Sequence, residues 1–284
     1  MGLAFVLMWS SAFTSARIIV QDAPPFMALS FRFLISGCIA VGLAFALGQR
    51  IRLGRSQWSS VVIFGVCQNG LYLGLFFVAM QWIEASLAAV IASMMPLIVA
   101  LLSRVFLKEN IRPMAVTGLI AGFIGVTVIM GGRISGGADV FGLLLTGIGV
   151  LALAIATLAV RGASSGGNIL MIVGLQMLIG AVFLLIPALA LETYAVNWSL
   201  KLVLAFSYTV FVPGLIATWV WFKLVGRIGT VRAATFHFLN PFFGVAFAAA
   251  LLSETISSGD IVGVIVIAAG IFAVQTSKRS PEFP

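Results

Sequence analysis

The chain has 284 residues, of which 62% are hydrophobic and 8% are charged, and its formal net charge is +8. This composition, with a mean hydropathy of +1.20, excludes a water-soluble domain, because a soluble protein of 30.0 kDa cannot bury so much apolar surface. The positive charge does not predict nucleic-acid binding here, since basic residues gather in the cytoplasmic loops of membrane proteins. We therefore expect the lipid bilayer to surround the chain.

Ten apolar stretches follow one another along the chain, each about 18 to 24 residues long, the length that crosses a hydrocarbon core of roughly 30 Å. They are apolar throughout rather than alternating, which predicts helices and not the strands of a membrane barrel. The dividers between them are short and leave no room for a domain outside the membrane. The predicted spans cover residues 2–20, 26–47, 58–80, 85–106, 113–131, 140–161, 168–190, 201–223, 231–252 and 258–276.

The first predicted span carries Trp9 and Ser10, which can contribute to a path through the bundle. In the third span, Asn69, Tyr72 and Phe76 follow one another at i, i+3 and i+7, which would place them on one face of an α-helix. Polar side chains in hydrocarbon are costly and usually face the bundle interior. We interpret these residues as cavity candidates, and hydrogen bonding between helices remains the alternative.

Arg32 is a charged residue inside the second predicted span. Its side chain could extend to the membrane surface, pair with an external acid such as Asp22, or hold a helix end. It could also bind the carboxylate of a substrate, which an amino-acid carrier would need. Of these readings the structural ones are favoured.

The fourth span places Ser93 and Met94 directly before Pro96. Proline removes a backbone hydrogen bond, so we expect the helix to break there. Methionine offers an adaptable surface to apolar ligands, although packing is the alternative role for this residue. Ser93 and Met94 are therefore further cavity candidates.

The eighth span contributes Tyr208 and Trp219 as cavity candidates, with a place in the aromatic belt at the membrane surface as the alternative. In the ninth, His237, Asn240 and Pro241 occupy i, i+3 and i+4, and His237 is the single histidine of the chain. An ionisable group in a membrane span indicates function by default. A buried histidine that only donates and accepts hydrogen bonds is the alternative, and Pro241 predicts a second helix break.

The chain repeats itself, because residues 88–128 align without a gap with residues 233–273, at a constant offset of 145. Repeats of this kind in a membrane protein indicate a transporter that moves one repeat against the other. We predict a first repeat over residues 1–132 and a second over residues 140–279, joined by residues 133–139. The matched pairs include Pro96 and Pro241, Glu109 and Glu254, Gly118 and Gly263, and Gly125 and Gly270.

Orientation follows from the basic residues between the spans. With the N-terminus in the cytoplasm, the loops on that side and the C-terminus carry twelve Lys and Arg residues against three on the other side, so both termini are predicted to be cytoplasmic. Each repeat holds five predicted helices, an odd number, so the two copies must cross the membrane in opposite directions. The predicted fold is an all-α polytopic membrane protein with two inverted five-helix repeats. Glu109 and Glu254 are expected to cap helices.

The order of these motifs resembles that of the drug/metabolite transporter superfamily, in its ten-helix EamA-type branch. Residues 9–13, Trp-Ser-Ser-Ala-Phe, are similar to the family's W-G-x-x-F opening, with Ser10 where glycine is usual. Arg32 and the repeated Pro, Glu and Gly positions also resemble the family pattern. The resemblance implies a bacterial inner-membrane carrier that exports amino acids, other metabolites or toxic compounds, and the branch for aromatic and other amino acids is the most similar.

Several kinds of chemistry lack the residues they need. No Asp or Glu lies in the middle of a predicted span, so proton exchange by an embedded glutamate, as in small multidrug exporters of the superfamily, is not expected. A P-loop, a metal-ligand cluster and a Ser-His-Asp set are also missing, and Cys38 and Cys67 resemble buried hydrophobes. We expect neither enzymatic activity nor a cofactor or metal.

The resulting hypothesis is a monomeric exporter of small metabolites, with hydrophobic and aromatic amino acids as first candidates, that works by alternating access through a cavity between the repeats. An exporter of drugs or other toxic organic compounds is the alternative within the same class. An intramembrane enzyme or scaffold is the alternative from another class.

Overall fold

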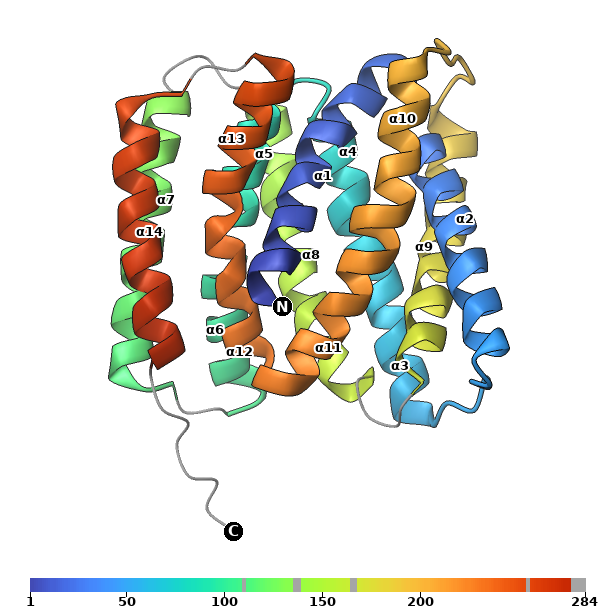
Figure 1. Cartoon of the computed structure of the whole chain (residues 1–284), viewed down its shortest axis with the longest axis horizontal. Helices are drawn as coiled ribbons and strands as arrows, with labels where there is room; N and C mark the ends of the chain where they lie inside the picture. The colour runs from blue at the N-terminus through green and yellow to red at the C-terminus, as the bar shows by residue number, and fades with distance from the viewer. Residues whose placement is uncertain (109–110, 135–138, 164–167, 254–255, 277–284) are drawn as a thin grey trace.

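A computed structural model describes residues 1–108, 111–134, 139–163, 168–253 and 256–276, and each regular element in these ranges is a helix (Figure 1). The expected caps Glu109 and Glu254 lie outside these residues. The α-helices are α1 Gly2–Asp22, α2 Pro25–Ala46, α3 Arg55–Phe64, α4 Leu73–Ala79, α5 Ala85–Ala92, α6 Met95–Phe106, α7 Pro113–Ile134, α8 Val140–Ala163, α9 Ile169–Leu191, α10 Leu200–Thr209, α11 Thr218–Ile228, α12 Thr230–Ala234, α13 Asn240–Leu252 and α14 Ser258–Thr276. Two π-helical turns, η1 Gly65–Tyr72 and η2 Val210–Ala217, and one 3₁₀ turn, η3 Thr235–Leu239, join some of them.

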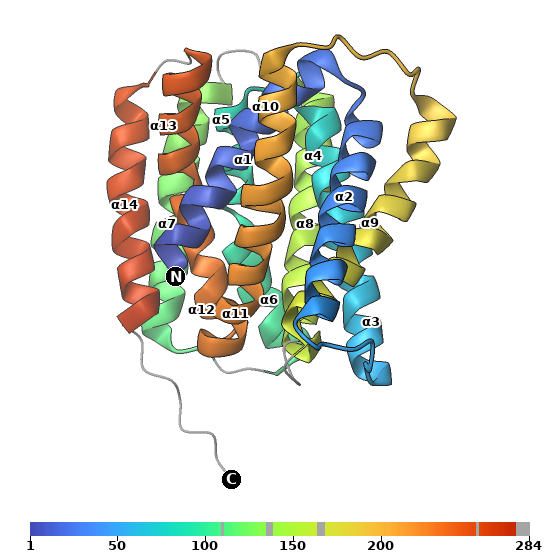
Figure 2. The same ribbon diagram turned by 45° about the vertical axis from the view of Figure 1, so that its right-hand side comes forward.

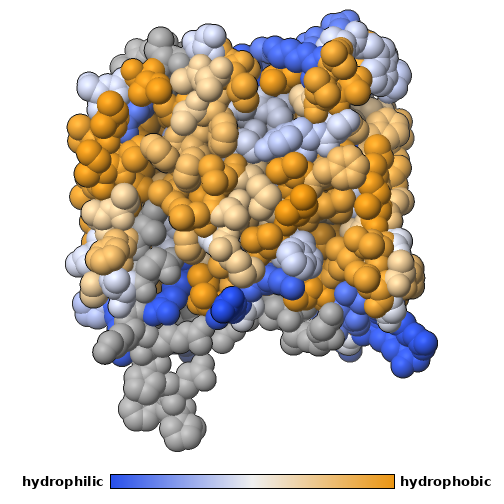
Figure 3. Space-filling view, in the orientation of Figure 1, coloured by the Kyte–Doolittle hydropathy of each residue, from blue (hydrophilic) through white to orange (hydrophobic). Residues whose placement is uncertain are grey.

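Within the described residues, eight helical runs are long and apolar enough to cross a membrane. Two shorter apolar runs, Pro113–Ile129 in α7 and Ser258–Val274 in α14, accompany them. Figure 3 shows apolar side chains over the middle of one face and hydrophilic ones gathered towards its two ends. The structure thus confirms the prediction of an all-helical polytopic membrane protein, while the count of ten crossings stays a prediction.

Helix boundaries repeat along the chain with the period of the sequence repeat. The helices α3, α4, α5, α6 and α7 begin 145 residues before α10, α11, α12, α13 and α14 respectively. The π-turn η1 likewise begins and ends 145 residues before η2. Pro96 and Pro241 occupy the first turns of the equivalent helices α6 and α13, each just after a break in its helical run. The duplication therefore extends to the irregular turns as well as to the regular helices.

Two outer helix pairs, α7 with α14 and α2 with α9, make the most extensive contacts of the bundle and lie at its opposite sides (Figures 1 and 2). Along α7–α14, a Cβ atom on Gly118 would lie 2.6 Å from the carbonyl oxygen of Gly270, and one on Gly125 would lie 2.6 Å from that of Gly263. Only glycine permits backbones to approach so closely in a membrane. Residue numbers along these contacts rise in α7 and fall in α14, so the two helices are antiparallel, as equivalent helices of an inverted repeat must be.

In the second outer pair, α2 and α9, hydrogen bonds join the two helices at one end. The carboxylate of Glu192, the residue after α9, accepts hydrogen bonds from the backbone amides of Phe26 and Met27 at 2.7 and 2.8 Å. These amides belong to the first turn of α2, where N–H groups lack partners within the helix. Glu192 therefore ties the end of α9 to the start of α2.

Between the two outer pairs, α1 runs through the centre of the bundle and packs against α13, α10 and α5 (Figures 1 and 2). Its buried aromatic residues Phe5, Trp9 and Phe13 recur every four residues. This spacing forms one continuous stripe along an α-helix. The aromatic stripe of α1 therefore belongs to the central core.

Candidate functional site

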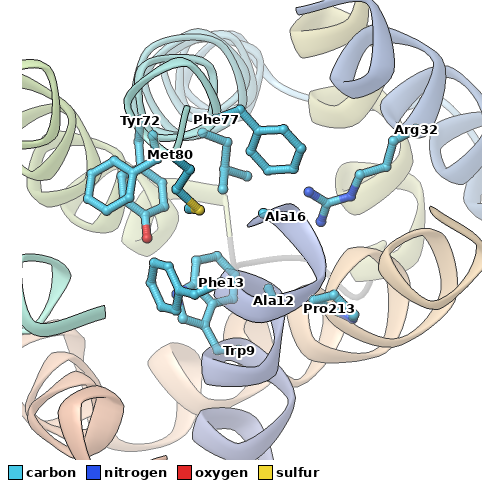
Figure 4. Close-up of a pocket in the computed structure, with 11 residues that line it drawn as sticks. Trp9, Ala12, Phe13, Ala16, Arg32, Tyr72, Phe77, Met80 and Pro213 are labelled. Atoms are coloured by element: carbon cyan, nitrogen blue, oxygen red, sulfur yellow. The ribbon is translucent and has the colours of Figure 1, made fainter. Parts of the chain in front are cut away.

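A cavity lies in the centre of the bundle, bordered by α1, α2, the η1–α4 run and η2, with 11 lining residues (Figure 4). The space is narrow in this structure and opens in part to solvent. Its aromatic lining consists of Trp9, Phe13, Tyr72, Phe76 and Phe77. Apolar walls with a few polar groups are typical of sites for small organic molecules.

Both π-turns reach this cavity. Tyr72 is the last residue of η1, and Pro213 lies inside η2, so segments from both halves of the chain line the same space. A π-turn replaces i→i+4 hydrogen bonds by i→i+5 bonds and occurs frequently at functional sites. The equivalent π-turns of the two halves thus each contribute a residue to the lining of one cavity.

Tyr72 places its polar group in an aromatic environment. Its ring is nearly parallel to that of Trp9, at 5° with centroids 6.4 Å apart, and lies 4.5 Å from the ring of Phe76. The hydroxyl of Tyr72 is buried and makes no hydrogen bond of good geometry among the described residues, and the side chain of Trp9 is the polar group near it. An unpaired buried hydroxyl costs roughly 1–3 kcal/mol, which a hydrogen bond to a bound molecule would offset.

Arg32 also lines the cavity and is the charged member of its lining. The residue is 4% exposed, its Nε donates to the carbonyl of Thr209 at 3.1 Å, and its guanidinium carbon lies 4.9 Å from the ring centroid of Phe33. Figure 4 shows the guanidinium directed into the cavity. The predicted site did not include Arg32, although a charge within an apolar span was a signal for it.

Ser10, His237 and Asn240 are brought together next to the cavity rather than in its lining. Ser10 Oγ donates to Asn240 Oδ1 at 3.0 Å, and Asn240 Nδ2 lies 3.1 Å from His237 Nδ1. An amide nitrogen can only donate, so Nδ1 is the acceptor. All three residues are buried, and their hydrogen bonds connect α1 to η3 and α13.

His237 is enclosed by aromatic rings. Phe5, Trp9 and Trp221 each contact it at a steep angle, with centroid distances of 5.3, 5.6 and 5.2 Å. Because Trp9 also lines the cavity, one indole separates the imidazole from the cavity space. His237 therefore supports the cavity wall through Trp9.

Asn69 contacts Gln176 of α9, whereas Tyr72 lines the cavity. Its Nδ2 donates to the backbone carbonyl of Gln176 in α9 at 3.0 Å and also to the side-chain oxygen of that residue. The expected common face assumed α-helical spacing, but both residues lie in η1, where each turn contains more residues. The wider turn separates the two side chains, and Asn69 joins α9 instead of lining the cavity.

Ser93 and Met94 also lie away from the cavity lining. The hydroxyl of Ser93 donates to the carbonyl of Val90 one turn earlier. Met94 packs against the apolar cluster that includes residues of α7 and α14. Both residues occupy the break between α5 and α6, where local hydrogen bonding and packing engage them.

The aromatic candidates of the eighth predicted span lie outside the lining too. Tyr208 is 37% exposed, and its hydroxyl is 2.6 Å from Ser11 Oγ. The ring of Trp219 is covered by Lys223, whose Nζ lies 4.0 Å from its centroid. From this span, Pro213 in η2 is the residue that lines the cavity.

Metal ligands are not assembled in the described part of the chain. No three His, Cys, Asp or Glu side chains come together there, and Cys38 and Cys67 are free thiols. The groups available for binding a small molecule at the cavity are therefore aromatic faces, one guanidinium and one hydroxyl.

A family model described as "EamA-like transporter family" matches residues 1–131 and again residues 140–276. The "Uncharacterized transporter YvbV" of Bacillus subtilis is 28% identical over 99% of this chain and 92% of its own length. The "Uncharacterized inner membrane transporter YedA" of Escherichia coli is 27% identical over 97% of this chain and 89% of its own. An "Uncharacterized transporter" of Archaeoglobus fulgidus is 26% identical over 96% of each.

A solved crystal structure is similar to this chain with a TM-score of 0.78 and 21% sequence identity. The similarity covers 97% of this chain and 94% of the other one. At this level of identity the comparison shows a common fold and nothing about substrate.

Proposed function

Because this chain belongs to the EamA-like transporter family, we propose that it is a secondary transporter of a bacterial inner membrane that exports small metabolites. Hydrophobic and aromatic amino acids are the first candidates. The relatives described above are named as transporters, which supports transport in general rather than this substrate. The cavity lies within one chain, so a monomer is the proposed working unit.

The observation that carries the proposal is the central cavity. Five aromatic residues provide an apolar wall, and Arg32 and the hydroxyl of Tyr72 provide two groups that could orient a ligand. A small molecule with a carboxylate and an apolar side chain, such as a hydrophobic amino acid, fits this combination, since few polar contacts among apolar walls fix orientation in such sites.

Alternating access is the proposed mechanism, with one half of the chain, residues 1–132, moving against the other, residues 140–279. Support comes from the π-turns and from the breaks before Pro96 and Pro241, which occur at equivalent positions in both halves. Paired interruptions of this kind surround the substrate site in transporters built from inverted repeats. The connecting residues 133–139 lie partly outside the described part of the chain.

Purified protein in liposomes tests the proposed function. Uptake or counterflow of a panel of radiolabelled amino acids is measured with and without a pH gradient. We expect saturable flux of hydrophobic and aromatic amino acids in the absence of any partner protein or chemical conversion. Liposomes that move none of the panel faster than protein-free ones would contradict the amino-acid proposal.

The proposed orientation places both termini in the cytoplasm. The start of α3 and the loop before α10 lie at opposite ends of the bundle (Figures 1 and 2). We expect a cysteine at Gly54 to react with an impermeant reagent from the cytoplasmic side, and one at Ala195 from the outside. Labelling of the two positions from the opposite sides would show that both termini lie outside the cytoplasm.

A further inference from the structure

We propose that Arg32 binds the carboxylate of the transported molecule and that an amino group is not needed for recognition. The predicted substrate class is then a monocarboxylate with an apolar or aromatic body, of which amino acids are one part. This inference rests on the proposed transport function and names the chemical feature by which the cavity selects its substrate.

The first step in the argument is the uncompensated charge of Arg32. Its recorded partners in the described part of the chain are the carbonyl of Thr209 and the ring of Phe33, and no carboxylate is among them. The alternative ion pair with Asp22 is thus not formed. A buried charge without a counter-ion is destabilising, and charges in membrane spans mark functional pathways. A substrate anion would supply the missing counter-ion.

The second step is the direction of the free hydrogen-bond donors. A guanidinium carries five N–H groups, and the bond to Thr209 uses the one on Nε. The terminal nitrogens have no recorded partner among the described residues, and Figure 4 shows them directed into the cavity. Two parallel N–H groups match the two oxygens of a carboxylate. The bond from Nε to the backbone holds the fork in this direction.

The third step is the rest of the lining. Next to Arg32, the cavity continues along Phe13, Phe76 and Phe77, which would cover an apolar body. None of the 11 lining residues is acidic, so no carboxylate in the lining would receive an ammonium group. The charge of Arg32 in the same cavity also disfavours a second cation. The lining therefore favours the carboxylate and gives no reason for an amine.

Three related probes separate these features: phenylalanine, 3-phenylpropionate, which lacks the amine, and phenethylamine, which lacks the carboxylate. Each is tested on the full-length protein for a rise in melting temperature in detergent and for inhibition of phenylalanine flux in liposomes. We expect 3-phenylpropionate to act at concentrations similar to phenylalanine, and phenethylamine to have no effect at tenfold higher concentration. Stabilisation by phenethylamine, or no response to 3-phenylpropionate, would overturn the proposal.

Variants then assign the effect to the side chain. Arg32→Gln is expected to weaken 3-phenylpropionate binding roughly tenfold or more, because charge-assisted paired hydrogen bonds are lost. Arg32→Lys keeps the charge without the fork and should lie between, and it remains informative if the glutamine variant fails to fold. Arg52→Gln removes an exposed arginine as the matched control and should change nothing. Unchanged affinity in Arg32→Gln would refute the assignment.

The outcomes for this site and for the proposed function are separable. Phenylalanine flux that ignores 3-phenylpropionate refutes the carboxylate site and leaves amino-acid transport standing. Absence of flux for every amino acid refutes the proposed substrate, and the melting-temperature response to the three probes then decides the carboxylate site by itself.

Discussion

Along the α7–α14 pair, backbone contacts backbone, whereas around the cavity aromatic side chains surround a space. The outer pair uses glycines whose added Cβ atoms would lie 2.5–2.6 Å from the facing carbonyl oxygens. The central region uses large rings and interrupts its helices with π-turns. Among the described residues, the buried polar atoms without a hydrogen bond of good geometry lie outside α7 and α14. One of them is the hydroxyl of Tyr72, which lines the cavity.

The difference shows how one duplicated helix pattern can provide both closely packed helices and a cavity. Lipid tails are as apolar as leucine, so helices in a membrane associate through close packing rather than through the hydrophobic effect. Glycine contacts provide that close packing in the outer pair. At the centre, the cavity lining holds Arg32 and the hydroxyl of Tyr72, polar groups that a ligand can satisfy.

The largest expected effect is on stability, from Gly125→Ala in the outer pair. The new Cβ would lie 2.6 Å from the carbonyl oxygen of Gly263, so the helices must separate, at a cost of about 1–3 kcal/mol. Gly147→Ala in α8 is the matched control, because its Cβ would meet nothing within 4 Å. Unfolding curves in detergent measure both. Equal loss in the two variants would remove the distinction between the outer pair and other helices.

His237→Gln tests the support behind the cavity. The variant loses the ring contacts with Phe5, Trp9 and Trp221 and alters the bond to Asn240, so we expect a stability loss of about 1–2 kcal/mol and slower flux. The pH profile of flux should keep its shape, because Trp9 separates His237 from the cavity. A profile that becomes flat in the variant would identify His237 as a proton carrier instead.

Tyr72→Phe removes a hydroxyl that makes no hydrogen bond of good geometry and keeps the ring that packs in the core. We expect stability to stay within about 1 kcal/mol or to rise, since no hydrogen bond is lost. The KM of transport should increase severalfold if the hydroxyl contacts the substrate. Tyr208→Phe is the control: it loses the bond to Ser11, so stability should fall with KM unchanged. The reverse pattern would place the binding group at Tyr208.

The smallest effect is the pH dependence that comes from Glu192 in the second outer pair. Burial raises the pKa of this carboxyl above its usual value, against the opposing effect of the amides of Phe26 and Met27. A raised pKa in the folded state gives stability that is complete below the unfolded value of 4.5 and is lost as pH rises through the folded value. Between pH 4 and 7, the melting temperature of the unmodified protein should therefore fall relative to that of Glu192→Gln as pH rises. A change in the other direction would mean that the amide bonds outweigh burial.

Much of the fold could be predicted because its signals are local. Long apolar runs, prolines such as Pro96 and Pro241, and the repeated glycines mark where helices lie and where they begin. The offset of 145 visible in the sequence recurs in the helix starts and in the π-turns. The proposed repeat boundaries themselves stay a prediction.

The site was less predictable because its geometry depends on backbone details. Nothing in residues 65–72 marks an i→i+5 turn, so α-helical spacing placed Asn69 beside Tyr72 when it faces Gln176. The partner of Arg32 is a backbone carbonyl, which residue types do not reveal. The structure places the predicted residues Trp9, Tyr72 and Phe76 around one space, since buried aromatic residues at helical spacing converge on the core.

The π-turns also determine the direction in which the side chains after them point. Each residue of an α-helix advances about 100° around the axis, because a turn contains 3.6 residues. A π-turn adds one residue to a turn, so the side chains that follow it are rotated by about that angle relative to an uninterrupted α-helix. Because η1 and η2 lie at equivalent positions of the two halves, α4 and α11 receive the same rotation.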